Sequence, residues 1–230
     1  MVANRHNIWN KIFRVGRNIL PALAMVMLVG GSLSIATPKA QAAVKLFNTK
    51  ELKSSNLKKF KKWNSVLDRY KTEEPSELQK CKLSSTNKCA ITKWRIFLKK
   101  VSKEPDKLKQ LGLVNKYLNK RLYIIDPTNY KKKDYWATPE QFVNRNGDCE
   151  DYAISKYLSL LHLGFSKDDM RIVVLQDLNL KVAHAILVVY IDGKALVLDN
   201  QITSIVEAKR IKHYKPVFSI NENNWWLHRG

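Results

Sequence analysis

Acidic side chains are scarce in this sequence, whose 230 residues include 20 Asp and Glu against 41 Lys and Arg, for a net charge of +21. An excess of positive charge favours anionic partners, such as membrane headgroups, an acidic protein or nucleic acid. A simpler explanation, that most of the lysines solvate the exposed faces of helices, accounts for much of it. Internal repeats and low-complexity tracts are also missing, which argues against a solenoid or a long disordered linker.

The first 42 residues have the pattern of a secretory signal peptide. An apolar run, Ile19 to Ala36, precedes Ala40-Gln41-Ala42, whose small residues suit a signal peptidase. The basic start before that run contains Arg5, Lys11, Arg14 and Arg17. The alternative is an uncleaved membrane anchor, because the apolar run approaches the length that spans a bilayer. Pro21 and the Gly30-Gly31-Ser32 break favour cleavage.

Cleavage after Ala42 leaves residues 43–230, which are enough for a single domain. The removed segment carries five Lys and Arg and no acidic residue, so the remaining net charge is +16. Export argues against nucleic acid as a partner. Electrostatic contact with an anionic membrane surface remains open.

Cysteine is also rare, with three residues in the chain. Cys81 and Cys89 flank a polar loop, Lys82 to Lys88, and we expect them to close it as a disulfide in an oxidising compartment. The sequence does not establish the geometry that a disulfide needs. Cys149 is then the odd cysteine, and an unpaired thiol in an exported protein is a candidate for reactivity.

Residues 43–163 are predicted to be mainly helical, because apolar residues recur there at helical spacing. A first stripe contains Leu57, Phe60, Trp63, Leu67 and Tyr70, a second contains Ile91, Trp94, Phe97, Leu98 and Val101, and a third contains Leu108, Leu111, Val114 and Leu118. Thr138 and Gln141 fit a capping box that starts a short helix ending by Gly147. The next helix runs from about Asp148 to Leu163 and stops at Gly164. Its wide apolar arc predicts a central, buried position.

Residues 164–230 change to the pattern of strands. Ile172 to Leu175 is a continuous apolar run, and Val217 to Ile220 is a further candidate strand. Ala183 to Ile191 and Ala195 to Leu198 flank Asp192-Gly193, a strong signal for a two-residue hairpin. In that hairpin Ile191 faces Lys194, which makes His184 and Asp199 diagonal neighbours on one face.

Three residues then fit one chemical template. Cys149 at a helix N-terminus would be the nucleophile, because the helix dipole favours the thiolate. His184 would accept the thiol proton and later protonate the leaving group, and Asp199 would orient the imidazole. Backbone N–H groups at the start of the helix could hold the oxyanion, with Trp136 or Asn144 as possible helpers.

Three carboxylates surround this thiol, namely Asp148, Glu150 and Asp151. Carboxylates raise the pKa of a neighbouring thiol and weaken it as a nucleophile, so their presence suggests a bound cation. Oxygen ligands favour calcium over zinc. The simpler interpretation, a helix N-cap with acids in the first turn, explains one or two of the three. No EF-hand loop is present, so the metal signal from spacing alone is weak.

The segments Asn146-Gly147-Asp148-Cys149-Glu150-Asp151-Tyr152-Ala153, Ala183-His184-Ala185 and Leu198-Asp199-Asn200-Gln201 resemble the bacterial transglutaminase-like cysteine proteases, in particular the exported LapG-type proteases. The resemblance covers about residues 130–205. It implies an α+β, papain-like or transglutaminase-like fold with a helical N-terminal part and an antiparallel sheet. It also implies a triad of Cys149, His184 and Asp199, and calcium held by Asp148, Glu150 and Asp151.

The resemblance further implies a periplasmic role. Members of this family cleave the N-terminal region of a large surface adhesin, often at a paired-alanine site, and so disperse biofilm. An inner-membrane receptor for cyclic di-GMP sequesters them. The sequence therefore predicts a periplasmic, calcium-dependent cysteine endopeptidase. Two alternatives remain, a transglutaminase or cell-wall amidase with the same triad, and a calcium-stabilised binding module with an inert thiol.

Overall fold

The computed structural model describes residues 45–83 and 89–230, and within this range it describes no side chains for residues 73–83. The predicted signal peptide, residues 1–42, lies outside the described residues. So does the side chain of Cys81, and its pairing with Cys89 stays a prediction. None of the described helices is long and apolar enough to cross a membrane.

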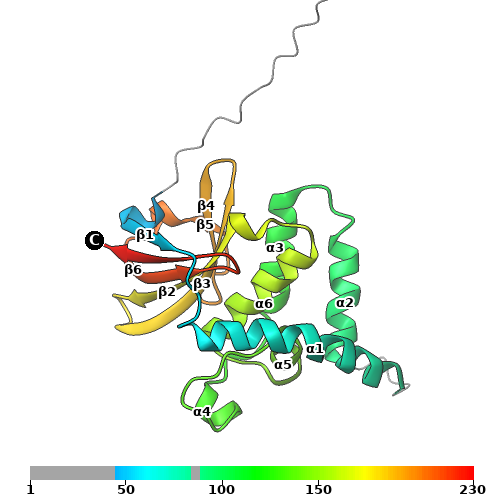
Figure 1. The fold of residues 1–230 in the computed structure, drawn as a ribbon. Coiled ribbons are helices and arrows are strands. Elements are labelled where there is room, and N and C mark those ends of the chain that lie inside the picture. Colours follow the sequence, from blue (N-terminus) through cyan, green and yellow to red (C-terminus); the bar gives the residue numbers. More distant parts are fainter. Residues whose placement is uncertain (1–44, 84–88) are drawn as a thin grey trace, which may run out of the picture. The chain divides into compact units, whose positions relative to one another are not determined.

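The helices of the described chain follow the predicted stripes closely (Figure 1). They are α1 (Lys61–Leu83), α2 (Ala90–Val101), α3 (Lys107–Leu118), α4 (Asp126–Asn129), α5 (Pro139–Arg145) and α6 (Cys149–His162), with 3-10 turns at Leu46–Asn48, Lys167–Asp169 and Ala208–Arg210. Thr138 caps α5 through the predicted capping box with Gln141. Gly164 follows α6 with a φ of 82°, a left-handed conformation that glycine adopts without strain. α1 begins later than the first stripe, since Leu57 and Phe60 lie before its first residue.

Seven antiparallel strands form one sheet in the order β1-β7-β6-β2-β3-β4-β5. They are β1 (Lys50–Ser54), β2 (Met170–Asp177), β3 (Val182–Ile191), β4 (Lys194–Leu198), β5 (Val206–Glu207), β6 (Tyr214–Ile220) and β7 (Trp225–Arg229). The β3–β4 hairpin has the predicted register, with Ile191 opposite Lys194. The expectation that residues 43–163 are helical is corrected by β1, which pairs with β7 at one edge of the sheet.

The helices lie against one face of the sheet, with α6 nearest to β3 (Figure 1). Leu187 and Val189 of β3 belong to the larger apolar core, together with Ile154 and Tyr157 of α6. The opposite face carries a second, smaller core that includes Ile186 and Val188. The α+β fold class is confirmed, and α6 is the buried central helix that its wide apolar arc predicts.

Candidate active site

Cys149 is the first residue of α6, and the turn before it is held by a second capping box. Asp148 is the N-cap, its side chain accepts from the backbone N–H of Asp151, and the Asp151 side chain accepts from the N–H of Asp148. Gly147 is needed here because a Cβ at that position would lie 2.1 Å from Oδ2 of Asp151. This close approach fixes the turn that presents the thiol.

The thiol lies between an acidic neighbour and β3. Cys149 Sγ donates a hydrogen bond to Glu150 Oε2 at 3.1 Å. Burial raises the pKa of the Cys149 thiol well above its ordinary value, and the carboxylates of Glu150 and Asp148 raise it further. A backbone hydrogen bond from Ala185 acts in the opposite direction and places the sulfur beside the residue that follows His184. Among the described residues Cys149 and His184 form no direct hydrogen bond, so this geometry has the thiol protonated.

His184 and Asp199 form the predicted pair. Nε2 of the imidazole lies 2.9 Å from Oδ1 of the carboxylate, and both residues are almost completely buried. Burial opposes ionisation of Asp199, but hydrogen bonds with His184, Gln201 and Tyr214 outweigh it and keep the pKa of this carboxyl below its ordinary value. An ionised carboxylate only accepts, so Nε2 carries the proton and Nδ1 of a neutral imidazole remains a base.

The pair lies at an open edge of the sheet. The β3–β4 ladder ends with Leu187 opposite Leu198, so Asp199 follows β4 instead of extending it. His184 lies opposite Leu175, which belongs to the smaller core, and at this edge of the sheet it also lines the cleft that Cys149 lines. Because β4 leaves the first residues of β3 without a neighbour on that side, the edge is free for the imidazole and Asp199 to meet.

Two residues that sequence reasoning missed hold Asp199 in place. The hydroxyl of Tyr214 donates to Asp199 Oδ2 at 2.7 Å, and its ring meets the His184 ring edge-on at 5.8 Å. The side chain of Asn119, at the C-terminal end of α3, donates to the backbone oxygen of Asp199 at 2.7 Å. Neither residue has a sequence signal, because each is far from Asp199 along the chain.

A cleft with a volume of about 620 Å³ brings Cys149 and His184 together. Its lining also includes Lys59, Phe60, Lys61, Lys62, Trp63, Tyr123, Asp134, Trp136, Asp148, Glu150, Val174, Ala183, Ala185 and Phe218. Of the two residues suggested as oxyanion helpers, Trp136 lines this cleft. Asn144 lines a different cavity together with Arg145.

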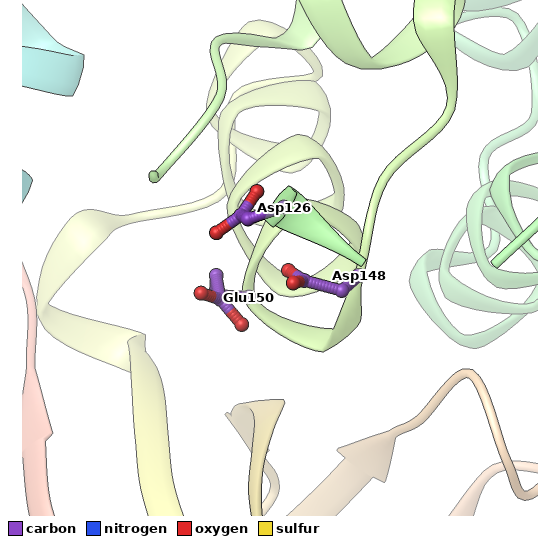
Figure 2. A group of neighbouring side chains, drawn as sticks. All are labelled: Asp126, Asp148 and Glu150. Carbon is purple, nitrogen blue, oxygen red and sulfur yellow. The ribbon is translucent and has the colours of Figure 1, made fainter. Parts of the chain in front are cut away.

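The acidic residues beside the thiol form a compact group with one unexpected member. Ligand atoms of Asp126, Asp148 and Glu150 lie within 4.8 Å of one another. The three carboxylates converge at the start of α6 (Figure 2). Oδ1 of Asp126 and Oδ1 of Asp148 are buried, and neither atom has a hydrogen-bond partner among the described residues. Burial, reinforced by Glu150 and Asp151, raises the pKa of Asp148 to about 9. Clustered carboxylates with unsatisfied buried oxygens fit a hard cation such as calcium.

The structure does not bring Asp151 into this group. Its Oδ1 accepts from the backbone N–H of Ala137 at 2.7 Å, and its Oδ2 accepts from the N–H of Asp148. These bonds give Asp151 the structural role of a capping residue. The metal role of Asp151 stays a prediction. Asp126, which lies 22 residues before Asp148 and has no spacing signal, is a further candidate ligand.

Comparison with known proteins decides the family. Residues 69–228 match the bacterial transglutaminase-like cysteine proteinases. The chain belongs to this family. Calcium-bound LapG of Legionella pneumophila is 34% identical, with a TM-score of 0.58 over 66% of this chain and 86% of LapG. EGTA-treated LapG of the same organism is 33% identical, with a TM-score of 0.59 over 67% of this chain and 86% of LapG. No curated protein sequence matches the chain.

Family membership makes the chain a cysteine peptidase with a transglutaminase-like fold, as its motifs predict. The cleft has the parts that this chemistry needs. A cysteine starts a helix, a histidine with one nitrogen available lies on the adjoining strand, and a carboxylate holds the other nitrogen. The roles of Cys149, His184 and Asp199 rest on this geometry together with the sequence template.

Proposed function

We propose that this protein is a periplasmic, calcium-dependent cysteine endopeptidase that cleaves the N-terminal region of a large surface adhesin. The observation that carries the proposal is that Cys149 and His184 line one cleft while Asp199 holds the His184 imidazole, with the acidic group of Asp126, Asp148 and Glu150 beside the thiol. In a peptidase whose nucleophile lies beside a cation-binding group, the reactivity of the nucleophile depends on whether the cation is bound.

The reaction follows from the atoms that are available. Nδ1 of His184 takes the proton from Cys149 Sγ, and the thiolate attacks the carbonyl carbon of the scissile peptide. Backbone N–H groups at the start of α6 stabilise the oxyanion, with the indole N–H of Trp136 as a further donor in the cleft. The imidazolium then protonates the leaving amine. His184 next activates a water, which hydrolyses the thioester and returns the proton to Sγ. Asp199 keeps its charge throughout and stabilises the imidazolium.

Asp126, Asp148 and Glu150 would hold the cation. A calcium ion held there would compensate the negative charge that raises the pKa of Cys149. Glu150 matters most in this respect, because its carboxylate accepts the thiol hydrogen bond. With Glu150 engaged elsewhere, the thiol proton is available to His184.

Adhesin cleavage, release of biofilm and control by an inner-membrane receptor for cyclic di-GMP belong to the same proposal. They are supported by the likeness to LapG over 86% of that protein, and by the signal-like pattern of residues 1–42. The positive net charge suits a protein that works close to an anionic membrane surface. Binding to the receptor would withhold the peptidase from its substrate when the nucleotide is abundant.

The experiment is cleavage of adhesin by residues 43–230. Purified protein is incubated with envelope extract in calcium or in a chelator, and new protein termini are identified by mass spectrometry. We expect an adhesin fragment that appears with calcium, disappears with chelator and returns when calcium is restored. The Cys149→Ala variant should give no fragment while its circular dichroism spectrum is unchanged.

Full cleavage by Cys149→Ala would refute the proposal. Incorporation of an added amine in place of hydrolysis would instead identify a transglutaminase.

A further inference from the structure

One wall of the catalytic cleft is built from five consecutive residues, Lys59 to Trp63, and three of these are lysines. The two aromatic residues fix the wall to the protein. Phe60 packs against Phe218 and Trp225 with ring centroids 5.3 and 5.2 Å away. Trp63 is fully buried, and its indole N–H donates to the backbone of Asn221 at 3.1 Å. Lys61 and Lys62, which lie between these two aromatic residues, and Lys59, which precedes Phe60, are therefore presented from a rigid support.

Two of the three lysines lack an acidic partner. Lys62 forms an ion pair with Asp134, which lines the same cleft. Lys59 lies over the Trp225 ring, with Nζ 3.5 Å from the ring centroid, a contact that leaves its charge uncompensated. Lys61 is exposed, and among the described residues neither it nor Lys59 forms an ion pair. Two positive charges thus face the cleft.

The remaining acidic residues of the cleft do not cancel these charges in the working enzyme. Asp148 and Glu150 belong to the carboxylate group beside the thiol, where a bound cation would compensate them. Asp134 is already paired with Lys62. The field that a substrate meets on the Lys59–Trp63 side is therefore positive, and low-dielectric aromatic walls strengthen such a field.

We propose that Lys59 and Lys61 select a polypeptide that carries an acidic side chain close to the scissile bond. This inference rests on the proposed peptidase function and adds a substrate class to it: an extended segment whose Asp or Glu lies against the Lys59–Trp63 wall. The lysines bind the substrate and set its specificity, and they take no part in the chemical step. Exposed ion pairs of this kind change affinity and association rate modestly, and salt weakens them.

Matched peptides test the preference. Internally quenched peptides with a paired-alanine core receive Asp, Asn or Lys in turn at each of three positions on either side. We expect Asp to raise kcat/KM about three- to tenfold over Asn at one or more positions, and Lys to lower it. The Lys61→Glu variant should reverse this order, and the exposed Lys116→Glu variant on α3 should keep it. Equal kcat/KM for Asp and Lys peptides at every position would overturn the proposal.

A second measurement needs no cleavable peptide, so it separates this inference from the proposed function. The alkylation rate of Cys149 is measured with anionic iodoacetate and with neutral iodoacetamide in low salt, with calcium present. The ratio of the two rates should fall about three- to tenfold in Lys61→Glu and stay unchanged in Lys116→Glu. An unchanged ratio in Lys61→Glu would contradict the positive wall even if no peptide is cut.

Discussion

The thiol of Cys149 is in a state that does not suit catalysis, because it donates to Glu150 and its pKa is raised. The same carboxylate belongs to the acidic group beside it. Any ligand that engages Glu150 therefore changes the nucleophile directly, at the distance of one hydrogen bond. At the scale of single residues, metal binding and thiol reactivity are coupled, because both involve the carboxylate of Glu150.

Asp126 gives the sharpest test of the acidic group. Asp126→Asn removes one charge and one strong oxygen ligand, so we expect calcium affinity to fall about tenfold or more. The measurement is isothermal titration of chelator-treated protein with calcium. Asp134→Asn is the matched control, because Asp134 lines the same cleft but pairs with Lys62. Equal affinities for Asp126→Asn and the unaltered protein would remove Asp126 from the site.

Tyr214 is a positioning residue for Asp199. Tyr214→Phe deletes one hydrogen bond to an ionised carboxylate, and we expect kcat to fall about tenfold with little change in KM. Tyr190→Phe is the control, because the Tyr190 hydroxyl on β3 is buried and has no hydrogen-bond partner among the described residues. Its removal should leave kcat unchanged. A similar decrease in kcat in the two variants would show that the hydroxyl of Tyr214 does not orient Asp199.

The sequence predicts residues that have a local signal and misses those that depend on long-range approach. Cys149 is marked by its acidic turn, and the hairpin register relates His184 to Asp199. Asp126 and Tyr214 are distant from Cys149 along the chain and lie near the site only in the folded structure. A single sequence does not show which distant residues approach one another. Asp151 shows the converse, since this carboxylate is adjacent in sequence but its oxygens accept hydrogen bonds from the backbone of Ala137 and Asp148.

The turn that starts α6 depends on the absence of one side chain. In Gly147→Ala the new Cβ meets Asp151, which two backbone hydrogen bonds hold in place, so the free energy of unfolding should fall by about 1–3 kcal/mol. Catalytic activity should fall as well, because the same turn presents Cys149. Urea denaturation and peptide cleavage measure the two effects.

Gly112 is the matched control, because it lies inside α3 and a Cβ there meets nothing within 4 Å. Gly112→Ala should raise the free energy of unfolding by about 0.5–1 kcal/mol, since alanine favours a helix interior. Should both alanine variants be equally stable, the close approach at Gly147 would not constrain the turn.

Elements with strong local signals agree with the structure, whereas β1 has no such signal and was not predicted. The capping box of α5 and the Asp192-Gly193 hairpin combine turn chemistry with apolar periodicity. β1 has the sequence Lys-Glu-Leu-Lys-Ser, which is short, polar and typical of a sheet edge. Residues 50–54 form a strand because they pair with β7. Sheet order could not be predicted for the same reason, because β6 and β7 are placed by pairing with distant segments.

The stability of the whole molecule should respond to pH and calcium together. Without metal, burial raises the pKa of Asp148 to about 9, above the value of about 4 in an unfolded chain. A carboxyl with a raised folded-state pKa stabilises the fold at low pH, and this contribution is lost as pH rises from about 4 to about 9. Calcium binds the ionised form and offsets the loss.

We therefore expect the increase in Tm on adding calcium to be larger at pH 8 than at pH 5. Thermal unfolding followed by circular dichroism, with calcium or chelator at each pH, makes the comparison. Titrating groups away from the acidic group of Asp126, Asp148 and Glu150 contribute equally to both samples and cancel in the difference. An increase that is the same at both pH values would mean that Asp148 does not ionise on binding.

The pairing of β1 with β7 also bears on biogenesis. Residues 50–54 find their sheet partner only among residues 225–229, and the hydroxyl that orients Asp199 comes from residue 214. Synthesis from the N-terminus makes residues 214 and 225–229 after Cys149 and His184. A nascent chain that has not yet reached residue 214 therefore lacks the hydrogen bond that orients Asp199, and its His184–Asp199 pair is not yet held in place.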